Sequence, residues 1–229
     1  MSTNLTLCLA VCMATSPAEK TDLGAAHKKF VQGVEHFATI LSDLPKPLAK
    51  NWKKPAEGFE QSKHLAVALS RYQKRGIEEF DKVHETFYRF RQIIRKNYDD
   101  CLELVAQAKA AKKKGEADSY QSLAELYWKA MENYEEGWKK MTRQLKIFQL
   151  SRSQLERRIK SAPAFISLAE TIRLIGDKDL ETKMTAIAIR QATDLNTTLS
   201  HFREFAADVR AVSDELQPLK SKKKPTEKE

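Results

Sequence analysis

The chain has 229 residues, of which 31% are charged, and a formal net charge of +9. Glycine and proline are scarce, at seven each. No stretch approaches the roughly 18 apolar residues of a transmembrane helix, so the composition argues against a membrane-spanning protein and favours a helical one with large polar faces. The positive charge favours an acidic partner, such as anionic lipid, nucleic acid or an acidic protein, without choosing among them.

Cysteine and histidine offer no pattern of a metal or redox site. Cys8, Cys12 and Cys101 form no CxxC or Cys/His cluster, and the five histidines are scattered. The sequence also lacks a glycine-rich phosphate loop, a nucleophile elbow and the ExxH signature of di-iron bundles. We therefore expect no metal, no cofactor and no enzymatic activity.

The N-terminal segment, residues 1–21, contains a short apolar run from Leu5 to Ala14. This run has the length of a signal-peptide core, but no lysine or arginine precedes it. We expect a flexible or loosely packed apolar segment, and a cleaved signal stays open as the alternative. Sequons at Asn4 and Asn196 are common by chance and add little.

A first helix is expected to start at Thr21 or Asp22 and to end before Leu44. Its apolar positions are Phe30, Val34, Phe37 and Leu41. The segment 44–58 follows, in which Pro45, Pro47 and Pro55 interrupt regular structure.

Trp52 lies in this proline-rich segment among Lys50, Lys53 and Lys54. A tryptophan among lysines is typical of an interfacial membrane anchor or of a base-stacking platform. The simpler alternative is a tryptophan that packs under an irregular connection.

The centre of the chain, Leu65 to Ala162, is expected to form two long helices folded back on each other. Apolar or small residues recur at multiples of seven in two rows on the first arm, which merge into one stripe. The rows are Leu69, Gly76, Val83, Phe90, Leu104 and Phe80, Phe87, Ile94, Cys101, Ala108.

Charged residues on the first arm are as regular. Arg75, Lys82, Arg89 and Lys96 form a basic row. The neighbouring row is Glu78, Glu85, Gln92 and Asp99, which places acids four residues before Lys82 and Arg89. The basic row is either a salt-bridged solvated face or a stripe that contacts an anionic surface.

The turn between the arms contains Lys112, Lys113, Lys114 and Gly115. Gly115 can adopt the left-handed conformation that ends a helix, and Asp118 or Ser119 can cap the next one. The three lysines give the hairpin a cationic tip that can touch phosphates.

The second arm has rows at Tyr127, Tyr134, Met141, Phe148, Leu155, Ala162 and at Met131, Trp138, Leu145, Arg152, Ile159. Arg152 does not suit a core, because a buried unpaired guanidinium is costly. It either extends to solvent along its stem or meets an acid from another helix or subunit.

Pro163 predicts a kink or short break, after which Phe165, Leu168, Ile172 and Ile175 continue at helical spacing. Gly176 then ends that helix, and Asp177 or Asp179 begins the last one. The last helix has a long apolar stripe: Leu180, Met184, Ile187, Leu195, Leu199, Phe202, Phe205, Val209, Val212, Leu216 and Leu219.

These elements predict an all-α fold: an elongated antiparallel bundle or coiled coil of three long helices plus a shorter N-terminal helix. We expect a single domain over residues 22–219 and a disordered charged tail over 220–229.

The order and length of the helices across residues 22–219 resemble the BAR-domain superfamily of helical dimers that bind anionic membranes. The resemblance implies a homodimer in which Lys112, Lys113 and Lys114 are hairpin-tip lysines. It makes Arg75, Lys82, Arg89 and Lys96 candidate surface contacts. The apolar N-terminus departs from the basic amphipathic leader of many such proteins, which puts an insertion mechanism in doubt.

We therefore expect a non-enzymatic, cytoplasmic, peripheral membrane protein that shapes or scaffolds anionic membranes. One alternative is a coiled-coil adaptor that binds protein partners without lipid. Another is a secreted helical toxin or lipid-binding bundle. Nucleic acid is not expected as a partner, because the basic residues are interleaved with acids and no recognised module is present.

Overall fold

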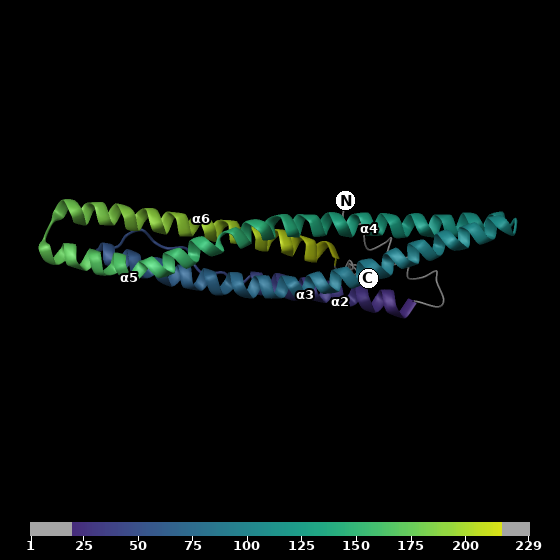
Figure 1. Cartoon of the computed structure of the whole chain (residues 1–229), viewed down its shortest axis with the longest axis horizontal. Coiled ribbons are helices and arrows are strands. Elements are labelled where there is room, and N and C mark those ends of the chain that lie inside the picture. Colours follow the sequence, from purple (N-terminus) through teal and green to yellow (C-terminus); the bar gives the residue numbers. More distant parts are fainter. Residues whose placement is uncertain (1–19, 217–229) are drawn as a thin grey trace, which may run out of the picture. The chain divides into compact units, whose positions relative to one another are not determined.

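The computed structural model describes residues 20–216, which contain helices and no strand. The helices are α2 (Lys20–Leu41), α3 (Pro55–Ala110), α4 (Lys114–Leu150), α5 (Arg152–Ile175) and α6 (Lys178–Leu216) (Figure 1). Long helices pack antiparallel, so the predicted all-α class is confirmed. The predictions for the segment before Lys20 and for the charged tail from Lys220 lie outside the described residues.

The helices contribute to two compact units. One unit, here the N-unit, contains the described residues up to His36, together with 81–140 and the described residues from Val209. The other, here the M-unit, contains 37–80 and 141–208. A single domain over 22–219 stays a prediction.

The core of the N-unit is a stack of aromatic rings from three helices. Phe87 lies against Trp138, with ring centroids 4.5 Å apart, and against Phe30 at 5.4 Å. Phe90 contacts Phe30 at 5.8 Å and Tyr134 at 4.9 Å. The three- and four-residue spacing along α3 places both phenylalanines on one face, which explains why this stripe is buried.

His27 of α2 lies at the edge of this aromatic core. Its Nε2 atom is 2.9 Å from the hydroxyl of Tyr134, and its ring lies 5.5 Å from that of Phe90. Burial lowers the pKa of His27 below its ordinary value of 6.5, because the charged imidazolium is poorly solvated there.

This lowered pKa predicts a pH-dependent stability. The unfolded chain binds a proton at His27 more readily than the folded chain does. The free energy of unfolding should therefore fall as pH drops below about 6.5. Urea denaturation between pH 7.5 and 5 measures the effect, and His27→Gln should flatten this part of the profile. An unchanged slope in the variant would contradict the assignment.

The core of the M-unit is built around Phe148 at the end of α4. Its ring lies 4.4 Å from Phe202 and 5.1 Å from Phe205 of α6. Tyr72 of α3 packs against it at 5.9 Å and donates a 2.7 Å hydrogen bond to the carbonyl of Leu41. A glycine at position 76 leaves room for the Phe148 ring, since a Cβ there would lie 2.9 Å from its Cζ.

Most of the predicted stripes are buried. On the first arm, nine of the ten positions are buried and Leu104 is exposed. Val105 is buried in its place. A straight helix repeats every 3.6 residues, so a strict seven-residue row drifts by about 20° per heptad and ends on the wrong face. On the second arm, all six residues of the row from Tyr127 to Ala162 are buried.

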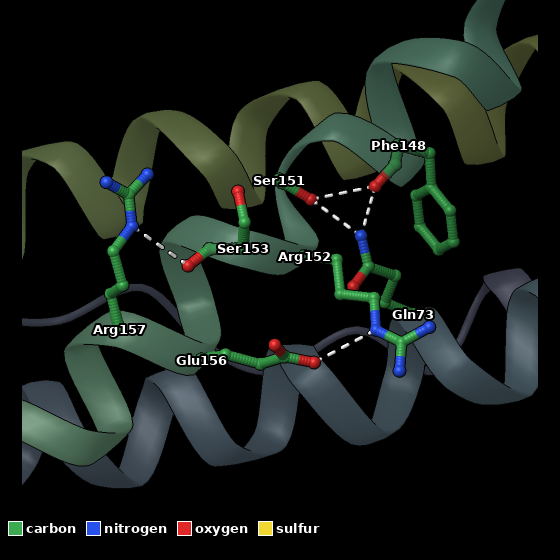
Figure 2. A network of polar contacts seen from close by, with 7 residues as sticks. All are labelled: Gln73, Phe148, Ser151, Arg152, Ser153, Glu156 and Arg157. Carbon is green, nitrogen blue, oxygen red and sulfur yellow. Dashed lines mark hydrogen bonds and ion pairs between the residues drawn. The ribbon is translucent and has the colours of Figure 1, made fainter.

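Of the kink or short break predicted at Pro163, the break is wrong, because Pro163 lies inside α5, and the kink stays a prediction. The interruption falls instead at Ser151, between α4 and α5. Figure 2 shows that the buried Gln73 side chain of α3 donates from Nε2 to the Phe148 carbonyl and, at 2.8 Å, to the Ser151 hydroxyl. The Ser151 hydroxyl donates to the same carbonyl at 2.8 Å. A contact from another helix therefore places the break. The exposed Pro163 removes one backbone donor from α5, and its ring crowds the carbonyl of Ile159.

The turn between α3 and α4 also differs from the prediction. The positive φ belongs to Lys112, at 58°, whereas Gly115 lies in the first turn of α4. Asp118 and Ser119 lie inside α4 and do not cap it. The Ser119 hydroxyl donates to the carbonyl of Gly115 at 2.9 Å. The helix begins earlier than the capping residues indicated, at Lys114.

α3 begins before Leu65, at Pro55. Proline suits the first position of a helix, because its missing N–H has no acceptor there and its φ is already helical. Pro55 thus starts regular structure, whereas its sequence context predicted that it interrupts it. The irregular segment itself runs from Ser42 to Lys54.

The junction between α5 and α6 is confirmed. Gly176 has a φ of 79° and its N–H donates to the carbonyl of Ile172 at 3.0 Å. The Asp177 carboxylate accepts from the N–H of Leu180 at 3.0 Å and so caps α6. Around this junction, four predicted core positions are exposed: Leu168, Ile175, Leu180 and Ile187.

Candidate anionic-surface sites

The lysine tip consists of Lys112, Lys113 and Lys114, all exposed at the α3–α4 turn. Lys113 Nζ lies 3.0 Å from the Glu116 carboxylate. Within residues 20–216, Lys112 and Lys114 make no ion pair. Lys109 adds a further exposed cation in the last turn of α3. The tip therefore presents unneutralised positive charge at a turn.

The basic row on α3 is largely engaged with neighbouring groups. Arg89 pairs with Glu85 at 2.5 Å, as its spacing predicted. Glu78 pairs with Lys74 at 4.0 Å and not with Lys82. Lys82 and Lys96 are exposed and each interacts with another group. Arg75 is exposed. This row is closer to a salt-bridged solvated face than to a cationic stripe.

Trp52 packs under the irregular connection. Its Nε1 donates to the Gln61 side chain at 2.8 Å, and its ring covers Gly58, where a Cβ would lie 2.6 Å from the ring. It also packs on a buried cluster formed by the start of α3, the end of α5 and the first half of α6, which contains Phe59, Ala169, Ile172, Met184 and Ala188. Lys50, Lys53 and Lys54 remain exposed beside it.

Asn196 of α6 holds the same segment from the other side. Its Oδ1 accepts from the N–H of Leu48 at 2.9 Å, and its Nδ2 donates to the carbonyl of Leu48 at 3.1 Å. A glycan on Nδ2 would compete with this pairing. In the folded chain, the Asn196 side chain therefore holds the backbone of Leu48 through two hydrogen bonds.

Arg152 extends into solvent and does not enter the core. Its side chain is 69% exposed, and Nε donates to Glu156 on the same helix at 2.9 Å (Figure 2). The polar residue that is buried in this region is Gln73, which was not predicted from the sequence. The signal in the sequence that could have identified Gln73 is its place as a polar residue on the apolar side of α3.

A groove of about 690 Å³ lies between α5 and α6 in the M-unit. Arg158 Nη2 and the Asp194 carboxylate, 2.6 Å apart, form an ion pair on its wall. Arg157 donates from Nε to the carbonyl of Ser153 at 3.2 Å (Figure 2). The other residues that line the groove include Leu150, Gln154, Thr197, Thr198 and His201. Sequence reasoning missed this groove because its walls are separated along the chain.

The described chain holds no cluster of histidine, cysteine or acidic residues that could bind a metal ion. Between Lys20 and Leu216, no helix combines the length and apolarity needed to cross a bilayer. The chain matches no protein-family model, no curated protein and no solved structure. The class that the fold defines is thus an all-α helical bundle.

Proposed function

We propose that this protein is a non-enzymatic peripheral membrane protein that binds anionic phospholipid surfaces through the lysine tip. The observation that carries the proposal is the pair of exposed lysines at the α3–α4 turn, Lys112 and Lys114, without an acidic partner among the described residues. A turn at the end of two long helices can approach a flat surface without a clash from the rest of either helix.

Charge supports a lipid surface as the partner. Each lysine near an anionic leaflet contributes about 1 kcal/mol, and this attraction decays within a Debye length of the surface. Cations on the α3 row are offset by acids, as in the Arg89–Glu85 pair. The free positive charge at the tip is therefore the better-placed electrostatic contact.

Homodimerisation is part of the same proposal, following the resemblance to BAR-domain proteins. Apolar side chains in the N-unit support it: Leu102 and Leu104 of α3 and Trp128 of α4 are exposed, and Trp128 lies 5.5 Å from the ring of Tyr98. Light scattering coupled to size exclusion measures the mass. A monomer across micromolar concentrations would contradict the dimer and leave the lipid contact to be tested separately.

Replacing all three tip lysines with glutamate should weaken binding to phosphatidylserine vesicles at least tenfold, because attraction becomes repulsion. Flotation at low salt gives the measurement, and added salt should weaken wild-type binding in the same assay. Circular dichroism should stay unchanged, since the three side chains are exposed.

A matched control reverses Lys28, Lys29 and Lys140, which are exposed in the same unit but away from the turn. It changes the net charge equally and should retain most of the binding. Equal losses in the two variants would show a diffuse charge effect. Wild-type protein that fails to float at low salt would contradict the proposal and favour the adaptor that binds proteins without lipid.

A further inference from the structure

The turn between α5 and α6 exposes apolar side chains that the fold leaves uncovered. Leu174 is 81% exposed and Ile175 is 71% exposed. Among the large apolar residues of the described chain, these are the two most exposed. Leu180, in the first turn of α6, and Leu168, two helical turns before the end of α5, are also exposed. In Figure 1 this turn extends past the first turn of α3, which belongs to the same unit.

The turn is held in one conformation. Gly176 ends α5 with a φ of 79°, and Asp177 caps α6. Ile172 is buried one turn earlier and packs with Met184 of α6 in the same cluster. Leu174 and Ile175 therefore project from a capped turn, and little backbone entropy remains to be lost when their side chains are buried elsewhere.

The charges near the turn nearly cancel. Lys178 pairs with Glu181 at 3.0 Å, and Asp177 is engaged as the cap. Arg173 and Asp179 are exposed with opposite signs. A contact made here would draw on apolar burial and would respond little to salt, in contrast to the lysine tip.

We propose that the α5–α6 turn is a second membrane contact, which inserts Leu174 and Ile175 into the headgroup–acyl boundary of a phospholipid bilayer. The inference deepens the proposed peripheral membrane function and rests on it. Binding of this kind scales with buried apolar area and does not require anionic lipid.

The shape of the turn favours lipid over protein as the occupant. A stable protein–protein interface takes roughly 20–30 residues on each side. The turn offers Leu174 and Ile175, with Leu180 in the first turn of α6, which is too few for such an interface. A bilayer deforms around a small insertion, so these side chains can be buried there.

A nearby tryptophan segment fits the same surface. Trp52 packs on the cluster that contains Ile172 and Met184, so the exposed Lys53 and Lys54 lie on the same end of the M-unit as the turn. Lysines beside an apolar insertion are typical of interfacial segments.

The test is flotation with vesicles of pure dioleoylphosphatidylcholine, which carry no net charge. The full-length wild-type chain should bind, and 0.5 M salt should change that binding by less than about twofold, because screening acts on charges and not on apolar burial. The double variant Leu174→Asp with Ile175→Asp should bind about tenfold less or worse. A second double variant, Leu174→Phe with Ile175→Phe, keeps both side chains apolar and should bind neutral vesicles as the wild-type chain does.

Leu150→Asp is the matched control, because Leu150 is 67% exposed in the same unit but lies at the end of α4. It should bind as the wild-type chain does. Wild-type protein that ignores neutral vesicles, or a double variant that binds normally, would overturn the inference. A double variant that loses mass on light scattering while keeping vesicle binding would also overturn it, and would assign the turn to a second copy of the chain.

The two membrane contacts fail separately. If the lysine-tip reversal weakens binding to anionic vesicles at least tenfold while neutral vesicles still bind the wild-type chain, both proposals stand. If the wild-type chain binds anionic vesicles but not neutral ones, the turn contact is contradicted and the lysine-tip contact stands. If neither the double variant nor the lysine-tip reversal loses vesicle binding, both contacts are contradicted.

Discussion

Replacing Phe87 with alanine is expected to lower the free energy of unfolding by about 3–5 kcal/mol. The side chain is 5% exposed, and its ring lies 4.5 Å from Trp138 and 5.4 Å from Phe30. Alanine would lose the transfer free energy of the ring and leave a cavity among side chains from three helices. Urea denaturation followed by circular dichroism measures the change.

The neighbouring Tyr88 provides the control. It is 54% exposed, so Tyr88→Ala should change the free energy of unfolding by no more than about 0.5 kcal/mol. A loss under about 1 kcal/mol for Phe87→Ala would mean that the stripe faces another direction. Similar losses for the two variants would contradict the assignment of the α3 core face.

The sequence predicted the fold class and most of the core, because helical periodicity is a local property. Positions such as Phe90, Tyr134 and Met141 recur at intervals that any amphipathic helix must bury on one side. The errors came from forces that act between distant residues. Gln73 captures the Phe148 carbonyl across the bundle, so the interruption falls at Ser151, where no proline marks it.

The candidate sites divide in the same way. The lysine tip could be predicted, because a charged turn between two long amphipathic stretches is readable from the residues. For Trp52 the sequence left an exposed anchor and a packed residue open, since its packing depends on Gly58 and on a cluster whose members, apart from Phe59, lie more than a hundred residues later. The exposure of Ile175 was also hidden, because the apolar spacing of α5 continues where no helix remains to cover it.

Phe148→Ala is expected to cost a further large loss, about 3–5 kcal/mol, in the M-unit. The ring is 1% exposed and packs within 6 Å of Tyr72, Phe202 and Phe205. Its removal would open a cavity between α3, α4 and α6. The free energy of unfolding measured in urea should fall with no change in the helical signal of the folded state. A small loss would mean that neighbouring side chains collapse into the space.

The glycine opposite this ring makes the prediction sharper. In the wild-type chain, Gly76→Ala gains about 1 kcal/mol of helix propensity but places a Cβ 2.9 Å from the Phe148 ring. Overpacking typically costs about 1–3 kcal/mol, so the net change should be a loss. In the Phe148→Ala background the clash is absent, and the same substitution should stabilise the chain.

Gly115→Ala is the control for propensity alone, because nothing lies within 4 Å of the added Cβ and the residue is helical. It should stabilise by up to about 1 kcal/mol. Destabilisation would instead indicate a left-handed Gly115 and would restore the turn geometry expected from the sequence. If Gly76→Ala costs the same with and without the Phe148 ring, the two residues are not in contact and the close approach of α3 to α4 is wrong.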